Sequence, residues 1–345
     1  MDFSGALVRW YKYNKRDLPW RRTTNPYYIW LSEVILQQTR VSQGLPYYID
    51  FLNTFPKVED LAYANEDKVL KMWQGLGYYS RARNLHYTAK EVVVNYSGEF
   101  PKDYDKILKL KGVGLYTAAA IVSFAFNMPY AVVDGNVIRL LSRFFGIDIP
   151  FDTLIGKKRF HELAYELLIK QKPALYNQAI MEFGALQCTP KSPNCFICPL
   201  QESCHAYSLG MVGLLPVKLK KTKVINRFLH FLVISCKGYI YLGKREKGIW
   251  RGLYDFPFLE FKERINQQKV LKSLDWDNFF GESQVNIISI SEEFFHVLSH
   301  QKIYARFWHL EINEISLEDY QLVLEKDLLS FPVSRLIEKY FESIQ

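Results

Sequence analysis

The chain lacks a long apolar run. Its longest apolar stretch extends only from Ala118 to Phe126 and is interrupted by Ser123. A membrane-spanning helix needs about 20 consecutive apolar residues, so the sequence predicts no membrane partner. Cysteine is also scarce, with five residues among 345, and no signal-peptide pattern follows Met1. Together these absences predict an intracellular protein in a reducing compartment, without a disulfide framework.

The composition excludes a disordered chain. Hydrophobic residues make up 49% and charged residues 23%, which is typical of a folded globular protein. A length of 345 residues is sufficient for two domains, each with its own core. The net charge of +8 and the 16% of aromatic residues are compatible with nucleic-acid binding, although many basic proteins bind none.

Two regions of different character are joined by a basic linker. Residues 1–208 show helical periodicity punctuated by Gly, Pro and Asn. The helices expected there include 30–41, 67–76, 117–126 and 136–145. Residues 209–226 combine glycines and a proline with a run of lysines, as a linker does. This run comprises Lys218, Lys220, Lys221 and Lys223.

Residues 227–345 predict a smaller α+β domain, because branched and aromatic residues are concentrated in several short segments. The expected strands are 228–234, 239–242 and 302–308, and the expected closing helix is 330–340. No short-period repeat is present in the sequence. The predicted architecture is therefore an all-helical domain, a linker and an α+β domain.

Four of the five cysteines form a compact cluster, Cys188-x6-Cys195-x2-Cys198-x5-Cys204. A reducing compartment disfavours disulfides between them. Four thiolates suit tetrahedral zinc, but zinc ribbons and knuckles usually pair two Cys-x2-Cys hooks, and this cluster has one. A single hook with longer arms can wrap a [4Fe–4S] cube. The spacing favours that cluster over zinc by roughly two to one.

A Gly-x-Gly turn, Gly112-Val113-Gly114, stands just before the helix expected at 117–126. Glycines permit close backbone approach, and the N–H groups of a helix N-terminus suit a phosphate oxygen. The plainer interpretation is a corner between two helices. Asp134 lies at the start of the next expected helix, where an N-cap contributes about 1 kcal/mol. The same carboxylate beside a phosphate-binding corner could also stabilise a cationic transition state.

This order of motifs resembles the helix–hairpin–helix DNA glycosylase superfamily, with the helix–hairpin–helix at about 106–126 and the iron–sulfur loop at 188–204. Four blocks are similar to its A/G-specific adenine glycosylase (MutY) family. They are Leu18-Pro19-Trp20-Arg21, residues 30–39, residues 73–85 and Val133-Asp134-Gly135-Asn136-Val137. The resemblance covers essentially the whole chain. It implies an all-α glycosylase domain with a [4Fe–4S] loop and a C-terminal α+β domain similar to a Nudix fold.

The resemblance also implies a mechanism. In bifunctional relatives a lysine four residues after the first hairpin glycine attacks the sugar, and here that position is Tyr116, which predicts a monofunctional enzyme. Glu33 would protonate adenine N7 and later act as base, and Asp134 would stabilise the oxocarbenium-like sugar. The acid role requires a raised pKa for Glu33. Tyr116 and Asn136 would hydrogen-bond these carboxylates. Without the resemblance, Glu33 would be read as a solvated helix residue and Tyr116 as a packing residue.

Excision at the glycosidic carbon requires the adenine to leave the base stack. The resemblance places its contacts at Trp20, Arg21, Leu36 and Gln178. It places Gln38, Leu76 and Tyr78 near the base opposite the adenine. Trp20 and Leu36 could equally be core residues. The paired glutamines of block 30–39 are harder to explain by packing, because buried amides need hydrogen-bond partners.

The C-terminal domain is predicted to recognise DNA rather than to hydrolyse nucleotides. A Nudix hydrolase needs an Arg-Glu-x-x-Glu-Glu helix, and residues 258–274 contain no such array. Segment 296–300 matches the family loop that inspects 8-oxoguanine, with Ser299 and His300 as its polar contacts. Many relatives carry Phe where this chain has Leu298, which predicts a weaker stacking or wedge contribution.

The sequence thus predicts a monomeric, monofunctional adenine DNA glycosylase acting on double-stranded DNA, on adenine opposite 8-oxoguanine and guanine. It would be cytoplasmic and associated with the nucleoid in a bacterium, and its protein partners are not readable from the sequence. One alternative is a thymine-mismatch glycosylase, against which Glu33 and the C-terminal domain argue. Another is a catalytically silent mismatch-binding protein, against which the intact pair of Glu33 and Asp134 argues.

Overall fold

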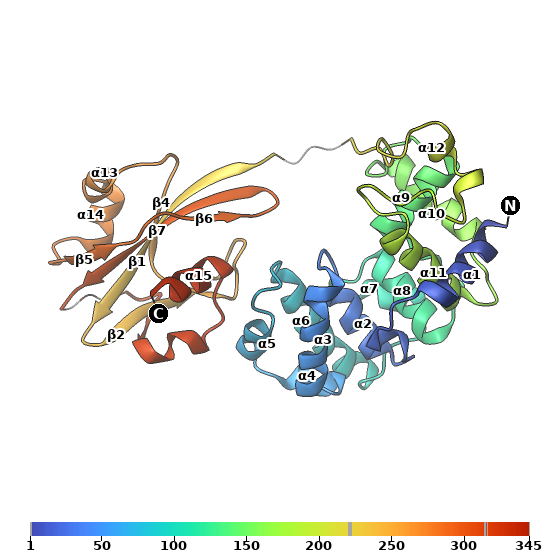
Figure 1. The fold of residues 1–345 in the computed structure, drawn as a ribbon. Coiled ribbons are helices and arrows are strands. Elements are labelled where there is room, and N and C mark those ends of the chain that lie inside the picture. The colour runs from blue at the N-terminus through green and yellow to red at the C-terminus, as the bar shows by residue number, and fades with distance from the viewer. Residues whose placement is uncertain (1, 220–222, 314, 316, 345) are drawn as a thin grey trace. The chain divides into compact units, whose positions relative to one another are not determined.

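The computed structural model describes residues 2–219, 223–313, 315 and 317–344. The chain divides into two compact units (Figure 1). Unit 1 consists of Met1–Ala62 and Tyr87–Lys221, and unit 2 of Tyr63–His86 and Thr222–Gln345. Residues 63–86, which the sequence places in the helical region, therefore cluster with the C-terminal part of the chain. No helix among the described residues is long and apolar enough to cross a membrane.

The regular secondary structure among the described residues of unit 1 is helical. Its elements are α1 (Phe3–Asn14), η1 (Pro19–Arg21), α2 (Pro26–Ile35), α3 (Val41–Thr54), α4 (Val58–Tyr63), α7 (Tyr104–Lys109), α8 (Leu115–Phe126), α9 (Gly135–Phe145), α10 (Leu154–Glu166), α11 (Pro173–Leu186), η2 (Gln201–Ser203) and α12 (His205–Ser208). Helix α4 ends one residue inside unit 2, and α6 (Ser80–Tyr96) begins in unit 2 and ends in unit 1. The predicted all-helical domain is confirmed.

One core of unit 1 brings together α1, α9, α10 and α11. Its buried side chains include Leu7, Leu141, Phe160, Tyr176 and Phe183, all at most 1% exposed. Burial of large apolar side chains is the dominant stabilising contribution in such a core. Helix α11 carries Phe183 in this core and contacts α1, α8 and α9. The core therefore fixes α9 and α11, the two helices that carry several polar residues discussed below.

Local backbone signals explain where the functional helices begin and end. Asp134 is the N-cap of α9, and its side chain accepts a hydrogen bond from the Val137 N–H. Gly112 has a φ of 79° in the turn between α7 and α8. An L-residue with a side chain rarely adopts that conformation. The expected helix 30–41 was too long, because α2 ends at Ile35 and Gln38 has a φ of 55°.

Unit 2 is built on an eight-stranded sheet. The strands are β1 (Ile225–Cys236), β2 (Tyr239–Lys244), β3 (Tyr254–Asp255), β4 (Phe258–Phe261), β5 (Asn286–Ile290), β6 (Phe294–Val297), β7 (Gln301–Glu311) and β8 (Gln321–Leu324). The main order is β3-β2-β1-β7-β5, while β4 pairs with β1, β6 with β7 and β8 with β2. Strands β1 and β7 are parallel, and His230 is opposite Arg306. The predicted α+β domain is confirmed.

Helices cover both faces of this sheet. The helices of unit 2 are α5 (Glu66–Met72), the start of α6, α13 (Gln267–Leu271), α14 (Leu274–Phe280), η3 (Glu325–Ser330) and α15 (Arg335–Ile344). One face packs Leu232 and Trp308 against residues of α13 and α14. On the other face, the Phe307 ring stacks on Tyr340 of α15 with 4.0 Å between ring centroids. Neighbouring residues of a strand point to opposite faces, which explains this division.

Two sequence-based boundaries differ from the structure at the C-terminal side. The closing helix begins at Arg335 rather than at residue 330, because Pro332 interrupts the segment before it and Val333 forms a bridge with Tyr254. Within the predicted linker 209–226, Val217 O accepts a hydrogen bond from Phe151 N at 3.1 Å, and strand β1 already begins at Ile225. Residues 220–222 of that linker, including Lys220 and Lys221, lie outside the described residues.

Candidate active site

A cavity of about 380 Å³ in unit 1 gathers all four predicted catalytic residues. We call it the Glu33 cavity. The predicted site residues that line it are Trp20, Arg21, Glu33, Leu36, Tyr116, Asp134, Asn136 and Gln178. They come from η1, the α2 end, α8, α9 and α11, so segments far apart in the sequence meet here. Its volume is in the range of pockets that bind small molecules.

Glu33 lies in the last turn of α2 and is only 7% exposed. Burial, and to a smaller degree the charge of Asp134, raises its pKa to about 7, although the Tyr116 hydrogen bond and the Arg21 charge oppose the shift. Desolvation disfavours the ionised form of a carboxyl group. The raised pKa lets Glu33 carry a proton near neutral pH, as a group that must first donate and later accept a proton requires.

Tyr116 fixes the orientation of Glu33. Its hydroxyl donates a hydrogen bond to Glu33 Oε2 with an O–O distance of 2.6 Å. Burial and the nearby charges of Glu33 and Asp134 raise the pKa of Tyr116 well above its usual value. The phenol therefore stays protonated and remains a donor. It lies in the first turn of α8, directly after the hairpin turn.

Asp134 is held by donors on both carboxylate oxygens. Oδ1 accepts from Val137 N at 2.8 Å, and Oδ2 accepts from Asn136 Nδ2 at 2.7 Å. Burial raises the pKa of Asp134, while these hydrogen bonds and Arg139 act in the opposite direction. Its place at the N-terminus of α9 also favours negative charge through the helix dipole. The structure thus presents a fixed carboxylate to the cavity.

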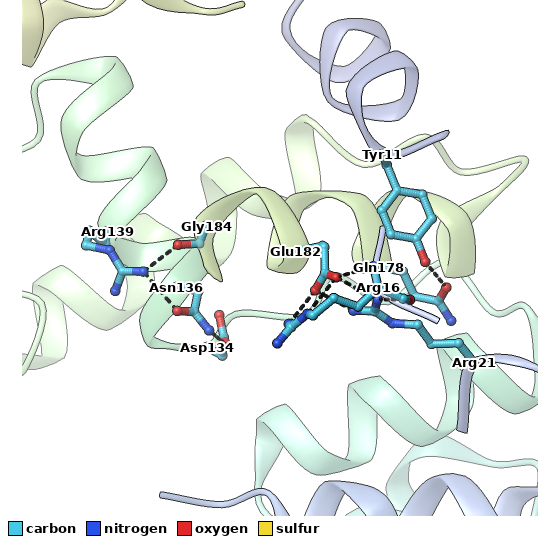
Figure 2. A network of polar contacts seen from close by, with 9 residues as sticks. All are labelled: Tyr11, Arg16, Arg21, Asp134, Asn136, Arg139, Gln178, Glu182 and Gly184. Atoms are coloured by element: carbon cyan, nitrogen blue, oxygen red, sulfur yellow. Dashed lines mark hydrogen bonds and ion pairs between the residues drawn. The ribbon is translucent and has the colours of Figure 1, made fainter. Parts of the chain in front are cut away.

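Arg139 connects Asn136 to the start of the cysteine loop, and Figure 2 shows its bonds to Asn136 and Gly184. Its Nη2 donates to Asn136 Oδ1 at 2.9 Å and to Gly184 O at 2.6 Å. Its Nε donates to Cys188 O at 2.8 Å. A planar guanidinium can satisfy several acceptors in a fixed arrangement. A continuous chain of hydrogen bonds therefore runs from Cys188 through Arg139 and Asn136 to Asp134.

Glu182 is a residue of this cavity that the sequence analysis missed. Arg16 Nη2 and Arg21 Nη2 both donate to Glu182 Oε2 at 2.6 Å, as Figure 2 shows. Burial opposes ionisation of Glu182, but the hydrogen bonds from Arg21 and Arg16 outweigh it and lower its pKa to about 2. Glu182 lies four residues after Gln178 on α11. This spacing places Gln178 and Glu182 on one face of the helix, and it is the signal by which the sequence could have indicated Glu182.

The remaining predicted adenine contacts are also ordered. Gln178 Oε1 accepts a hydrogen bond from the Tyr11 hydroxyl at 2.8 Å, which orients the amide (Figure 2). Trp20 is buried and meets the Tyr48 ring edge-on, with 5.1 Å between centroids. Leu36 caps the C-terminus of α2. Trp20 therefore both packs in the core and lines the cavity.

The residues predicted to contact the opposite base do not line the Glu33 cavity. Gln38 has a positive φ of 55° directly after α2, in unit 1. In unit 2, Tyr78 has a φ of 48°, and its hydroxyl is hydrogen-bonded to the Ser299 hydroxyl. Positive φ at non-glycine residues often marks functional positions. Leu76 is buried and His300 is exposed within the same unit.

The predicted phosphate loop forms the turn between α7 and α8. Gly114 is the N-cap of α8, and its Cα faces open space, with no atom within 4 Å of an added Cβ. Val113 is buried, and its N–H donates to Leu110 O at 3.1 Å, so this amide is already used inside the turn. The amides of the glycines that flank it are the better candidates for a phosphate.

The cysteine quartet lines one cavity, together with Arg143 from α9 and neighbouring apolar residues. The four thiols, Cys188, Cys195, Cys198 and Cys204, are free of disulfides. Arg143 Nη1 donates to Cys188 Sγ at 3.4 Å. Among the described residues, no group of three or more His, Cys, Asp or Glu side chains is placed so that it could hold a metal ion. All four thiols line the wall of this one space.

Two families of known proteins match parts of this chain. Residues 31–155 match the HhH-GPD superfamily base excision DNA repair protein family, and residues 229–343 match the NUDIX domain family. An adenine DNA glycosylase of Buchnera aphidicola subsp. Baizongia pistaciae is 36% identical over 322 residues, covering 91% of this chain and 88% of that protein.

Solved structures match the helical part. A thermostable thymine-DNA glycosylase has a TM-score of 0.56 at 31% identity and covers 60% of this chain and 95% of its own. An endonuclease III–DNA complex has a TM-score of 0.53 at 22% identity, with 60% and 94% covered, which supports the fold alone. Because the match to the Buchnera protein extends over most of both chains, this chain belongs to the adenine DNA glycosylase family of base excision repair enzymes.

Proposed function

We propose that this enzyme excises adenine mispaired with 8-oxoguanine, and with guanine, from double-stranded DNA, as a monomer and without lyase chemistry. The observation that carries the proposal is the buried Glu33, with a pKa near 7, in one cavity with Asp134. No lysine is among the described residues that line this cavity, which supports hydrolysis rather than Schiff-base formation.

Glu33 supplies the proton that makes adenine a leaving group. In its protonated form it donates to N7 of the base, and the N-glycosidic bond breaks as electrons move into the purine ring. Tyr116 holds Oε2, so the other carboxyl oxygen is available for this transfer. Glu33 then accepts a proton from the water that attacks the sugar carbon. A pKa near the working pH suits both steps.

Asp134 stabilises the positive charge that develops on the sugar. Its carboxylate is fixed by Val137 N and Asn136, so it does not need to reorganise when the cation forms. Arg139 in turn fixes the Asn136 amide. An oxocarbenium-like transition state opposite a carboxylate is the arrangement that glycoside hydrolases also use.

The adenine would be held by Trp20, Arg21, Leu36 and Gln178. Glu182 contributes indirectly to adenine binding, because its ion pairs with Arg16 and Arg21 restrict the conformations of both side chains. Gln38, Leu76, Tyr78, Ser299 and His300 would contact the opposite strand, where 8-oxoguanine lies. The hydrogen bond between Tyr78 and Ser299 supports a joint role for these two residues.

The four cysteines of the loop would hold a [4Fe–4S] cluster. Four free thiols around one shared space fit a multi-atom cluster better than a single zinc ion. When bound, the cluster fixes the loop that follows α11, and the hydrolysis needs no electron from it. The hairpin glycines Gly112 and Gly114 would bind a DNA phosphate, and such contacts predict binding that weakens steeply with salt.

A panel of duplexes tests this proposal. The protein is incubated with A:8-oxoG, A:G, T:G and C:G duplexes, each with the first-named strand labelled, and the strands are treated with alkali. We expect alkali-labile sites at adenine in the first two duplexes and an intact T strand. Cleavage without alkali would contradict the monofunctional mechanism. The structural similarity to a thymine-DNA glycosylase makes T:G cleavage the rival outcome.

A further inference from the structure

Unit 2 contains a further cavity, of about 610 Å³, on the sheet face that carries α13 and α14. We call it the His230 hollow. Its polar lining comprises His230, Arg264, Asn266, Gln267, Lys269, Glu293 and Arg306. Neither the predicted catalytic residues nor the predicted contacts to the opposite base line it. It is a separate feature of the C-terminal part of the chain.

The hollow exists because the helices cover only part of this face. In the parallel strands β1 and β7, Leu232 lies beside Trp308, and His230 lies beside Arg306 two residues earlier. Because residues two apart in a strand share a face, all four side chains lie on the same face of the sheet. Trp308 packs in the core with residues of α13 and α14. At the level of His230 and Arg306, the apolar packing ends and the hollow begins.

His230 is a fixed hydrogen-bond donor in the hollow. The residue is only 5% exposed, and its Nδ1 accepts a hydrogen bond from Trp308 Nε1 at 3.0 Å. The neutral ring must therefore carry its proton on Nε2. Burial and the charge of Arg306 lower the pKa of His230 to about 4, so the ring stays neutral near physiological pH. No hydrogen-bond partner of Nε2 is found among the described residues.

The cationic side chains are only partly neutralised. Arg264 Nη2 pairs with Glu293 Oε1 at 2.7 Å. Arg306 donates from Nη1 to Ser291 O at 3.3 Å and, like Lys269, has no carboxylate partner among the described residues. A guanidinium offers five N–H donors, so most of those on Arg306 remain for a ligand. The hollow thus combines excess positive charge with a donor at its buried wall.

We propose that the His230 hollow binds the terminal phosphate of a phosphorylated small molecule, with Arg306, Lys269 and the His230 Nε2–H as donors. Arginine and lysine are the usual partners of phosphate oxygens. The volume exceeds that of one phosphate group, so the hollow has room for an organic part of the ligand as well. His230 is almost fully buried, so a terminal phosphate can reach it more easily than a phosphodiester, which carries a sugar on each side. Only one carboxylate lines the hollow, which predicts binding without metal-dependent hydrolysis.

Calorimetric titration of the full-length protein tests the proposal, with deoxycytidine 5′-monophosphate as probe and deoxycytidine as its match without phosphate. A pyrimidine probe avoids the cavity proposed for adenine. We expect the nucleotide to bind at least about tenfold more tightly than the nucleoside, as charged hydrogen bonds imply. Inorganic pyrophosphate should compete with the nucleotide. A duplex without terminal phosphates should not.

Variants distinguish a defined site from diffuse attraction. Arg306→Gln and Lys269→Gln should each weaken nucleotide binding about tenfold. Lys272→Gln makes the same change of charge at an exposed residue just after α13, outside the hollow, and should leave affinity within about twofold. Equal loss in all three variants, or equal binding of nucleotide and nucleoside, would overturn the proposal. So would duplex DNA that competes while pyrophosphate does not, which would indicate a phosphodiester ligand.

A second readout does not depend on affinity. The His230 Nε2–H resonance should shift when pyrophosphate is added to the wild-type protein, and the Arg306→Gln variant should need about tenfold more pyrophosphate for the same shift. Thermal unfolding of each variant checks that the fold is retained. Adenine excision by Lys269→Gln should match the wild type, because the proposed hydrolysis uses no residue of the hollow. If the His230 Nε2–H resonance of the wild-type protein does not shift with pyrophosphate, the result would count against the site even if some binding is measured.

Discussion

Replacement of Tyr116 by Phe tests how the pKa of Glu33 is set. The Tyr116 hydroxyl donates to Glu33 Oε2 at 2.6 Å and stabilises the ionised carboxylate, so it lowers a pKa that burial raises to about 7. Loss of a hydrogen bond to a charged group costs about 1.5 kcal/mol, which corresponds to a pKa change of about one unit. Without the hydroxyl, the pKa of Glu33 should therefore rise by about one unit.

The single-turnover rate of adenine excision as a function of pH measures this shift. Because the acid form of Glu33 starts the reaction, the rate should fall on the alkaline side. The midpoint of this fall gives the pKa of Glu33 in the enzyme–DNA complex. In Tyr116→Phe this midpoint should move to higher pH by about one unit. Tyr27→Phe is the matched control, since it removes another buried hydroxyl, bonded to Phe55 O at 2.8 Å. A midpoint that stays in place or moves to lower pH in Tyr116→Phe would refute the reasoning.

Three further predictions follow from the polar contacts of unit 1. The depressed pKa of Glu182 contributes stability above its unfolded-state pKa that is lost as pH falls toward about 2. Glu182→Gln should therefore lose about 3 kcal/mol in the free energy of unfolding at neutral pH and show a flatter acid dependence in denaturant titrations. Arg139→Lys cannot satisfy Asn136 Oδ1, Gly184 O and Cys188 O together, so the excision rate should fall about 10- to 100-fold while the duplex still binds. Gly112→Val, at a φ of 79°, should cost about 1–3 kcal/mol of stability and weaken duplex binding in fluorescence anisotropy; unchanged affinity would place the phosphate elsewhere.

The sequence was sufficient for elements whose signals are local. Asp134 caps α9 as its position before a helix predicts, and the concentration of branched and aromatic residues located β1 and β7. The segment 30–41 was read as one helix because its apolar pattern continues past Ile35. The structure instead ends α2 there and gives Gln38 a left-handed backbone, which periodicity does not encode. Pro332 is a local signal that the closing helix starts later.

Contacts between distant segments could not be read in the same way. The bond between Tyr116 and Glu33 was expected from a family resemblance, but the ion pairs of Arg16 and Arg21 with Glu182 join residues more than 160 positions apart. No local pattern predicts such a network, because it depends on how η1 and α11 pack. The His230 hollow has the same origin, since it requires β1, β7 and the segment before α13 to meet. Packing, rather than propensity, creates both sites.

The most direct test of the central claim compares wild-type protein with Glu33→Gln in single-turnover excision of adenine from an A:8-oxoG duplex. Glutamine preserves the size of the side chain and cannot donate a proton to the base at neutral pH. Loss of general acid catalysis should reduce the rate by at least about 10²-fold, while thermal unfolding confirms the fold and anisotropy confirms binding. Equal rates for the two proteins would contradict the assignment of Glu33 as the catalytic acid.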